Sequence, residues 1–419
     1  MIDHIWPTQV LGENEVAAIS SGGTPSRKHP EYFNGEIMWV KSGDLNDSCL
    51  FETSETISEL GLKQSAAKLL PPNTVLIAMY GATVGKTSLL KHEAATNQAV
   101  CTIQPNPSIY NPLFLQYLLI LLRQHLLNER YGGAQPNISQ TIIRNLELPC
   151  PRVSEQENIA AVLWKVQRAI EVEEKLIATA RELKQSAMRQ LFTRGLQGVA
   201  QKETDIGLIP DSWNPRTILE LCEIWSGGTP RKSIAEYWSG NVPWVSGKDL
   251  KSPSLDDAID HISVAGVESA CRLAPQGAVL LLVRGMGLAK DLPVAVINRP
   301  MTFNQDVKAL VTRGEYSGRF LRSAIYVGKE RLLSRIVPSA HGTMTLNLDD
   351  VENFKVACPS DPDEATEIVA IFDALDRKIS LHERKRLTLK ELFKTLLHKL
   401  MTGEIRVADL DIDVSEVTQ

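Results

Sequence analysis

The chain has 419 residues, of which 43% are hydrophobic and 23% charged, and its formal net charge is −5. This length is too great for one ordinary core, so we expect two or more domains. No run of about 18 apolar residues exists, which excludes a membrane-spanning helix, and the first residues lack the pattern of a secretory signal. The negative charge disfavours a free-standing nucleic-acid binder, unless positive charge is local or a partner supplies it.

The six cysteines, at positions 49, 101, 150, 222, 271 and 358, are scattered and form no C-x-x-C pair. We therefore expect reduced, mostly buried thiols of a cytoplasmic protein, and neither zinc ligands nor disulfides. The eight histidines include no H-x-E or H-E-x-x-H cluster, so no metal site is predicted.

One stretch of the chain occurs twice, at a constant offset of 205 positions. Residues 21–25 read SGGTP, and so do residues 226–230. The identical pairs that follow are Glu31 and Glu236, Tyr32 and Tyr237, Gly35 and Gly240, Trp39 and Trp244, Val40 and Val245, Asp44 and Asp249, and Leu45 and Leu250. Such a match without gaps indicates an internal duplication.

In the first half, short apolar runs between turn residues predict strands at residues 37–40, 74–80 and 98–103. Leucines at helical spacing then predict a helix around residues 115–126. In the second half, residues 278–283 correspond to the second of these strands, and Asn304-Gln305 corresponds to Asn97-Gln98.

Two segments are predicted to be long helices. From Ser154 to about Leu191 there is no proline or glycine, and apolar residues recur mainly every three or four positions. Ser154 with Glu157 matches a capping box. The segment from Glu364 to Met401 repeats the pattern. Because a helix of roughly 57 Å with a narrow apolar seam needs a partner helix, we expect the two segments to pack together.

The predicted fold class is therefore α+β, with two copies of one globular–helix unit. We place mixed α/β domains at residues 1–150 and 213–358 and long helices at residues 151–198 and 359–403. Residues 199–212 are predicted to be a linker. Residues 404–419 form an acidic tail that we expect to be solvated and partly disordered.

Three motifs resemble catalytic ones but fail on spacing or context. Residues 81–87 place three residues, not four, between the first glycine and the Gly-Lys pair of a P-loop, and a strand–turn–strand with a loop lysine explains them better. Residues 111–114, NPLF, lack the second proline of the N-P-P-[FY] motif of adenine methyltransferases and fit a helix start. Pro362-Asp363 with Asp376-Arg377-Lys378 imitates a nuclease motif, but both pieces lie on or just before one helix, where they cannot share a metal.

The order of these motifs resembles the specificity (S) subunit of type I restriction–modification systems. The matching pieces are the repeated stretch, the sequence IGLIPDSW at residues 206–213, Pro151 with Glu155, Gln156 and Ile159 at the start of the first long helix, and the helix ends LFTRG and LMTG. The resemblance covers nearly the whole chain except the tail. One departure is that the second helix opens with Glu364-Ala365 where the family pattern has Glu-Gln.

The resemblance implies two target recognition domains, each reading one half of a bipartite DNA sequence. The long helices would pack as an antiparallel coiled coil between them, with internal pseudo-twofold symmetry. It also implies that this chain has no catalytic residue and binds no cofactor. Adenine methylation with S-adenosylmethionine would belong to two modification subunits, and ATP- and Mg-dependent translocation and cleavage would belong to restriction subunits.

With DNA as the implied ligand, hydroxyl and basic residues on and near the repeated loops are candidates, because arginine can bind a guanine edge or a phosphate in bidentate fashion. The predicted DNA-contacting residues are Thr24, Arg27, Lys28, Lys41, Lys86, Thr229, Arg231, Lys232, Lys248 and Arg284. The alternative is a structural turn whose glycines and proline only set the chain direction. Two domains that read different sequences should differ where they touch bases, so we predict that the shared SGGTP loop is structural and that the diverging residues read DNA.

Glu155 and Gln156, together with Arg384 and Lys385 in the basic stretch 383–399, are predicted to contact partner subunits. A solvated coiled-coil face is the alternative explanation of this basic stretch. Two other functions stay open at this point: a solitary methyltransferase or nuclease, and a coiled-coil scaffold with no role in DNA binding.

Overall fold

The computed structural model describes residues 5–128, 137–338 and 342–407. The chain divides into two compact units: unit 1 comprises Met1–Lys175 with His382–Gln419, and unit 2 comprises Leu176–Leu381. Each unit therefore contains one half of each long helix, α4 (Val153–Arg194) and α10 (Pro362–Met401). Most of the predicted acidic tail, from residue 408 onward, lies outside the described residues.

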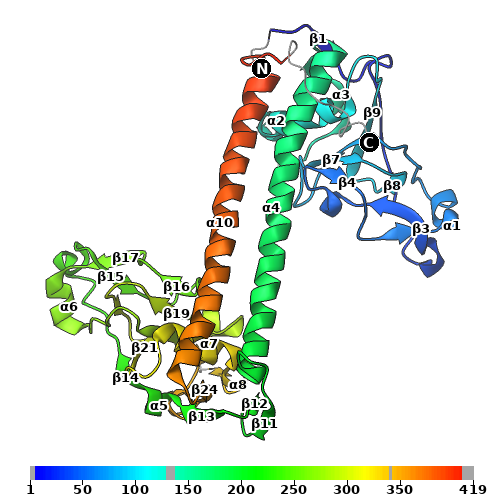
Figure 1. Cartoon of the computed structure of the whole chain (residues 1–419). Coiled ribbons are helices and arrows are strands. Elements are labelled where there is room, and N and C mark those ends of the chain that lie inside the picture. Colours follow the sequence, from blue (N-terminus) through cyan, green and yellow to red (C-terminus); the bar gives the residue numbers. More distant parts are fainter. Residues whose placement is uncertain (1–4, 129–136, 339–341, 408–419) are drawn as a thin grey trace. The chain divides into compact units, whose positions relative to one another are not determined.

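Unit 1 is built on a five-stranded sheet of order β2-β9-β6-β7-β4, in which only β4 and β7 are parallel. A three-stranded sheet has the order β5-β3-β8, and β1 pairs with β10. Strands β3, β4, β7 and β8 of this unit are labelled in Figure 1. The strands are β1 (Thr8–Val10), β2 (Ala17–Ser21), β3 (Phe33–Val40), β4 (Cys49–Leu50), β5 (Thr56–Ile57), β6 (Val75–Ala78), β7 (Thr87–Leu90), β8 (Ala94–Thr96), β9 (Val100–Pro105) and β10 (Glu147–Pro149). The shorter helices are α1 (Glu59–Lys63), α2 (Pro112–Asn128) and α3 (Gln140–Arg144).

The central strand β6 explains why this part of the sequence is apolar without alternation. Val75 and Ile77 belong to the core that contains α2, whereas Leu76 and Ala78 belong to a second cluster on the other side of the strand. Side chains alternate between the two faces of a strand, so a strand covered on both faces needs a continuous apolar run.

Unit 2 repeats these three sheets strand for strand, and it also contains the antiparallel pair β22–β23. Its five-stranded sheet has the order β14-β21-β18-β19-β16, its three-stranded sheet has the order β17-β15-β20, and β13 pairs with β24. The strands are β13 (Trp213–Thr217), β14 (Cys222–Ser226), β15 (Val242–Val245), β16 (Ser254–Leu255), β17 (Asp260–Ile262), β18 (Val279–Leu282), β19 (Val294–Ile297), β20 (Thr302–Phe303), β21 (Val307–Thr312), β22 (Val337–Pro338), β23 (Met344–Thr345) and β24 (Lys355–Pro359). The helices are α5 (Ile218–Leu221), α6 (Val264–Ala270), α7 (Gly318–Val327), α8 (Lys329–Leu333) and α9 (Leu348–Glu352).

Within each unit, a half of α4 packs antiparallel to a half of α10. In unit 1, Ile159 near the start of α4 shares a core with Leu400 at the end of α10. In unit 2, Phe192 near the end of α4 stacks on Phe372 near the start of α10, with ring centroids 6.5 Å apart. The prediction that the two long helices are each other's partners is confirmed.

The segment between α4 and β13 differs from the prediction of a plain linker. β11 (Gln201–Thr204) and β12 (Gly207–Pro210) pair antiparallel as a hairpin. Gly207 closes its turn with a φ of 102°, a value that a side chain disfavours. Gly207 and Pro210, residue types that are common in linkers, are here the first and last residues of β12.

A buried carboxylate lies in the helix pair of unit 1. The side chain of Glu173 is 3% exposed, and its two oxygens lie 2.6 Å from Lys385 Nζ and 2.6 Å from His382 Nδ1. Hydrogen bonds from Lys385 first, and from His382 second, hold the pKa of Glu173 below its ordinary value of 4.5. A carboxylate with a lowered pKa stabilises the folded chain only while it is ionised.

We therefore expect the helix pair of unit 1 to lose stability in acid. The contribution of Glu173 is complete above pH 4.5 and is lost as the pH falls through the lower pKa of the folded chain. Thermal unfolding of the wild type and of Glu173→Gln, followed by circular dichroism at about pH 6 and about pH 4, measures this contribution. The variant should be less stable than the wild type at the higher pH, and its stability should change less in acid. An equal loss of stability in acid in both proteins would show that other groups cause the acid sensitivity.

Candidate nucleic-acid interface

The glycines of the repeated SGGTP loop allow its backbone to approach a neighbouring turn closely. A Cβ on Gly22 would lie 1.8 Å from the carbonyl oxygen of Thr96, and one on Gly227 would lie 2.2 Å from that of Phe303. The indole of Trp39 donates a hydrogen bond to the carbonyl of Gly23 at 3.1 Å, and the corresponding indole of Trp244 donates to Gly228 at 2.9 Å. These shared contacts support the interpretation that the loop is structural.

Backbone hydrogen bonds bring three further segments of unit 1 to this loop. The amide of Gly23 donates to Thr96 O at 2.9 Å, the amide of Asn97 donates to Val40 O at 2.9 Å, and the amide of Met79 donates to Ala99 O at 2.8 Å. We call the resulting surface the loop face of unit 1. It consists of residues 22–28, 41–45, 79–86 and 97–99, and it brings together all five DNA-contacting candidates of this unit.

Unit 2 has a loop face of the same construction. Gly228 donates to Phe303 O and Asn304 to Val245 O, both at 2.9 Å, and Val283 donates to Asp306 O at 2.9 Å. The loop face of unit 2 consists of residues 227–232, 246–250, 283–290 and 304–306. It carries the other five candidates, Thr229, Arg231, Lys232, Lys248 and Arg284.

In unit 1 two of the predicted cations are paired with an acidic residue that the sequence had not singled out. Glu55 accepts from Lys41 Nζ at 2.5 Å and from Arg27 at 2.7 Å. The hydrogen bond from Lys41 is the main cause that lowers the pKa of Glu55, and Arg27 adds to it. The Arg27 guanidinium also lies 4.3 Å from the ring centroid of Phe33. Both cations are therefore held in place, whereas Lys28 is exposed and Lys86 half-buried.

In unit 2 Lys248 is paired in the same manner, 2.6 Å from Asp260, which stands 205 positions after Glu55. Arg231, Lys232 and Arg284 are exposed. Exposed cations on loops beside a sheet end are suited to contact with phosphates or base edges.

Arg272 is a further basic residue beside the loop face of unit 2, and sequence reasoning missed it. Its guanidinium lies 3.6 Å from the ring centroid of Trp225. The thiol of the preceding Cys271 donates to Gly228 O at 3.2 Å, which places this pair next to the SGGTP loop. No pattern in the sequence indicates that Arg272 lies beside this loop.

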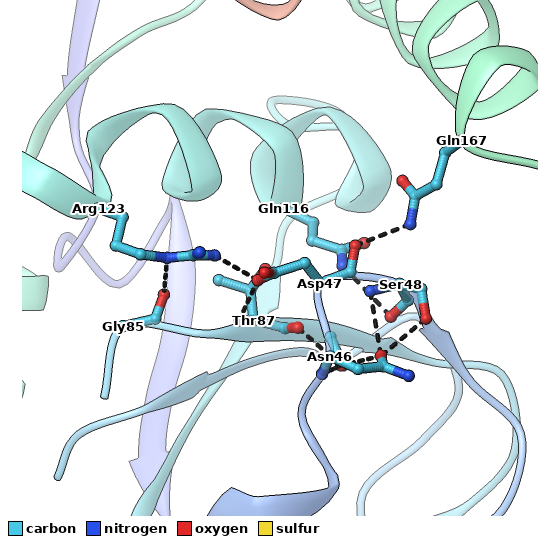
Figure 2. A network of polar contacts seen from close by, with 9 residues as sticks. Asn46, Asp47, Ser48, Gly85, Thr87, Gln116, Arg123 and Gln167 are labelled. Carbon is cyan, nitrogen blue, oxygen red and sulfur yellow. Dashed lines mark hydrogen bonds and ion pairs between the residues drawn. The ribbon is translucent and has the colours of Figure 1, made fainter. Parts of the chain in front are cut away.

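A polar network positions the loop that carries Lys86 (Figure 2). Arg123 of α2 donates to Gly85 O at 2.8 Å and forms an ion pair with Asp47. The same carboxylate accepts from the amide of Thr87 at 3.1 Å, and the side chain of Gln167 on α4 donates to Asp47 O at 2.8 Å. The network therefore joins the β6–β7 loop to α2 and α4 within unit 1.

Glu155 and Gln156, which the sequence predicted to contact partner subunits, are buried. Gln156 is fully buried, and its side chain accepts from the amide of Asn111 and donates to Ile109 O and Pro151 O. Glu155 is buried and binds Arg406 in bidentate fashion, at 2.6 and 3.0 Å. Both side chains hold unit 1 together, and a contact of Glu155 or Gln156 with partner subunits stays a prediction.

The basic candidates on α10 are on its surface. Arg384 is exposed, and Lys385 is exposed although its ammonium binds Glu173. They stay candidates for a partner contact.

No group of three His, Cys, Asp or Glu residues within residues 5–128, 137–338 and 342–407 is placed to hold a metal ion. Burial raises the pKa of the thiols of Cys101, Cys222 and Cys358 to about 12, so these thiols are protonated at neutral pH. Residues 81–87 join two antiparallel strands, β6 and β7, and Asn111 caps the start of α2 with its side chain. In the described part of the chain, no helix is long and apolar enough to cross a membrane.

The family model of the type I restriction modification DNA specificity domain matches residues 10–182 and again residues 210–391. The chain belongs to this family. Among relatives, the type I restriction enzyme MjaIX specificity subunit of Methanocaldococcus jannaschii is 24% identical over 94% of this chain and 93% of its own length. The EcoR124I/EcoR124II specificity subunit of Escherichia coli is 29% identical over 38% of this chain and 40% of its own length.

Solved structures agree on the fold of this specificity subunit. The type I restriction-modification S subunit from M. genitalium has a TM-score of 0.62 at 17% identity and covers 95% of this chain and 96% of its own. A chain from a study of complex assembly and conformational transition of the type I R-M system has a TM-score of 0.55 at 19% identity, with 96% and 98% covered. The predicted family, two repeated domains and paired helices are confirmed.

Proposed function

We propose that each unit of this specificity subunit reads one half of a bipartite DNA target through its loop face. The main observation behind the proposal is that the two loop faces share one backbone arrangement but carry different exposed side chains. Thr24 and Thr229 occupy the same place, but the residues that follow differ, with Arg27 tied to Glu55 in unit 1 and Arg231 exposed in unit 2. Two loop faces with the same backbone arrangement and different cations are suited to two half-sites of different sequence.

We also propose that this chain catalyses no step itself and binds no cofactor. Two modification subunits would methylate adenine with S-adenosylmethionine, and restriction subunits would supply ATP- and Mg-dependent cleavage in the cytoplasm. Family membership supports this assignment, and so do residues 81–87, which join two antiparallel strands, and residues 111–114, which begin α2. Partner subunits that bind phosphates would also offset the net charge of −5.

The test of the proposed function is Arg231→Ala in the complex assembled with its modification subunits. Methylome sequencing of cells with and without the chain first identifies the target. Losing a bidentate base contact costs about 1–3 kcal/mol, so methylation should fall about 5- to 150-fold, with sequence preference relaxed in one half-site only.

Lys202→Ala, which removes a cation from the β11–β12 hairpin outside the loop faces, is the matched control and should leave methylation unchanged. An unchanged motif and rate for Arg231→Ala would show that this residue does not read DNA. Methylation or cleavage by the purified chain alone, given S-adenosylmethionine, Mg²⁺ and DNA, would instead favour a solitary enzyme.

A further inference from the structure

We propose that Gln98 and Gln305 are a matched pair of DNA-backbone contacts, one in each unit, whose side-chain amides donate to phosphate oxygens whatever the sequence. The inference rests on the proposed function and deepens it. Nothing in the sequence pattern assigned a role to these residues, although each stands in the Asn-Gln pair that occurs in both halves.

Both glutamines are exposed on their loop faces, and both are held by the same partner. The hydroxyl of Thr24 donates to Gln98 Oε1, and the hydroxyl of Thr229 donates to Gln305 Oε1 at 2.6 Å. An amide whose oxygen is occupied in this way keeps its NH₂ group, with two donors, for another acceptor.

The backbone that carries each glutamine is fixed before any ligand arrives. The Asn97 side chain accepts from the amide of Ala99 at 3.1 Å, and the Asn304 side chain accepts from the amide of Asp306 at 3.1 Å. The SGGTP loop closes over the same turn through the contacts of its glycines with Thr96 and Phe303. A donor held in one orientation loses little conformational entropy when it binds.

Two observations indicate the class of ligand: the cations near each glutamine, and the identity of the two glutamine sites. The glutamines share their loop faces with exposed cations, Lys28 in unit 1 and Arg231, Lys232 and Arg284 in unit 2, which suits an anionic polymer. A group that is identical in two units cannot distinguish two unlike half-sites. Amide groups that donate to phosphates fix the position and orientation of a protein on DNA without reading its sequence. We assign this role to the two glutamines.

Substitution of each glutamine by glutamate separates this role from a structural one. Gln98→Glu and Gln305→Glu keep an oxygen that accepts from the threonine hydroxyl, but they replace the NH₂ donor by a negatively charged oxygen. The experiment measures duplex affinity of the assembled complex, for target and non-target DNA at one fixed salt concentration, together with the methylated motif and the melting temperature.

We expect each glutamate variant to weaken binding of target and non-target DNA alike, by about 10-fold or more, with the methylated motif and the melting temperature unchanged. Gln98→Ala and Gln305→Ala, which lose the donor without adding charge, should weaken both by about 3- to 10-fold. Gln124→Glu adds the same charge at an exposed position of α2 outside the loop face and should bind as the wild type does.

Wild-type affinity in the glutamate variants would overturn the proposal, and a changed motif would show that the glutamines read bases. Lower melting temperature with unchanged affinity would assign them to the frame alone. If the wild-type complex itself methylated without sequence preference, the proposed function would fail, independently of the glutamines.

Discussion

Replacing Trp213 by alanine is expected to lower the free energy of unfolding of unit 2 by about 4 kcal/mol, the usual cost of emptying a buried aromatic site. Trp213 is fully buried, with its ring 5.6 Å from Phe192 of α4 and 6.3 Å from Phe320 of α7. Its indole donates to Glu364 at the start of α10 at 2.9 Å. The substitution therefore removes ring packing against α4 and α7 and a hydrogen bond to a carboxylate of α10.

Hydrogen exchange read by mass spectrometry measures this effect, because peptides report each unit separately in a chain whose units need not unfold together. Exchange should accelerate in peptides of unit 2. Trp225→Ala is the matched control: this half-buried ring packs at the edge of the core and beneath Arg272, and its loss should cost about 1 kcal/mol. Equal effects of the two substitutions would contradict a central role for Trp213.

Replacing Gln156 by alanine is expected to cost unit 1 about 3 kcal/mol, because the amide of Asn111 and the carbonyls of Ile109 and Pro151 lose their side-chain partner in a buried place. Two of these bonds are 2.8 Å long and the third is 2.9 Å. Peptides around residues 105–115 and the start of α4 should exchange faster.

This prediction also decides between the two interpretations of Gln156. A partner contact would leave the isolated chain as stable as the wild type and weaken only assembly with the modification subunits. Gln124→Ala, at an exposed position of α2, is the control and should change stability by less than about 0.5 kcal/mol. Normal exchange in Gln156→Ala would favour the partner contact.

The second helix shows why the sequence could not reveal the surroundings of Gln156. Ala365, where the family pattern has glutamine, is buried, and Trp213 and Glu364 provide the contacts at this end of unit 2. Glutamine at the start of a helix has the same appearance in a sequence whether it faces water or caps a buried turn. The carbonyls of Ile109 and Pro151, which lie outside the helix, determine which of the two applies to Gln156.

The charged candidates show the same limit. Arg27 and Lys41 were predicted from their basic character and their place after the repeated loop, and their positions on the loop face agree with that. Their ion pairs with Glu55 could not be predicted, since Glu55 is 28 positions from one and 14 from the other along the chain. In unit 2, Asp260 does the same for Lys248.

The sequence by itself determined the duplication, the family and the two paired helices. These depend on spacing within one segment or on identity between two segments, and both can be read along a chain. Only the tertiary structure decided which polar side chains are buried, which cations are already paired and which donors face outward. Glu155, Glu55, Gln98 and Gln305 obtained their roles in this way, because burial and hydrogen bonding depend on neighbours that the fold brings together from distant positions.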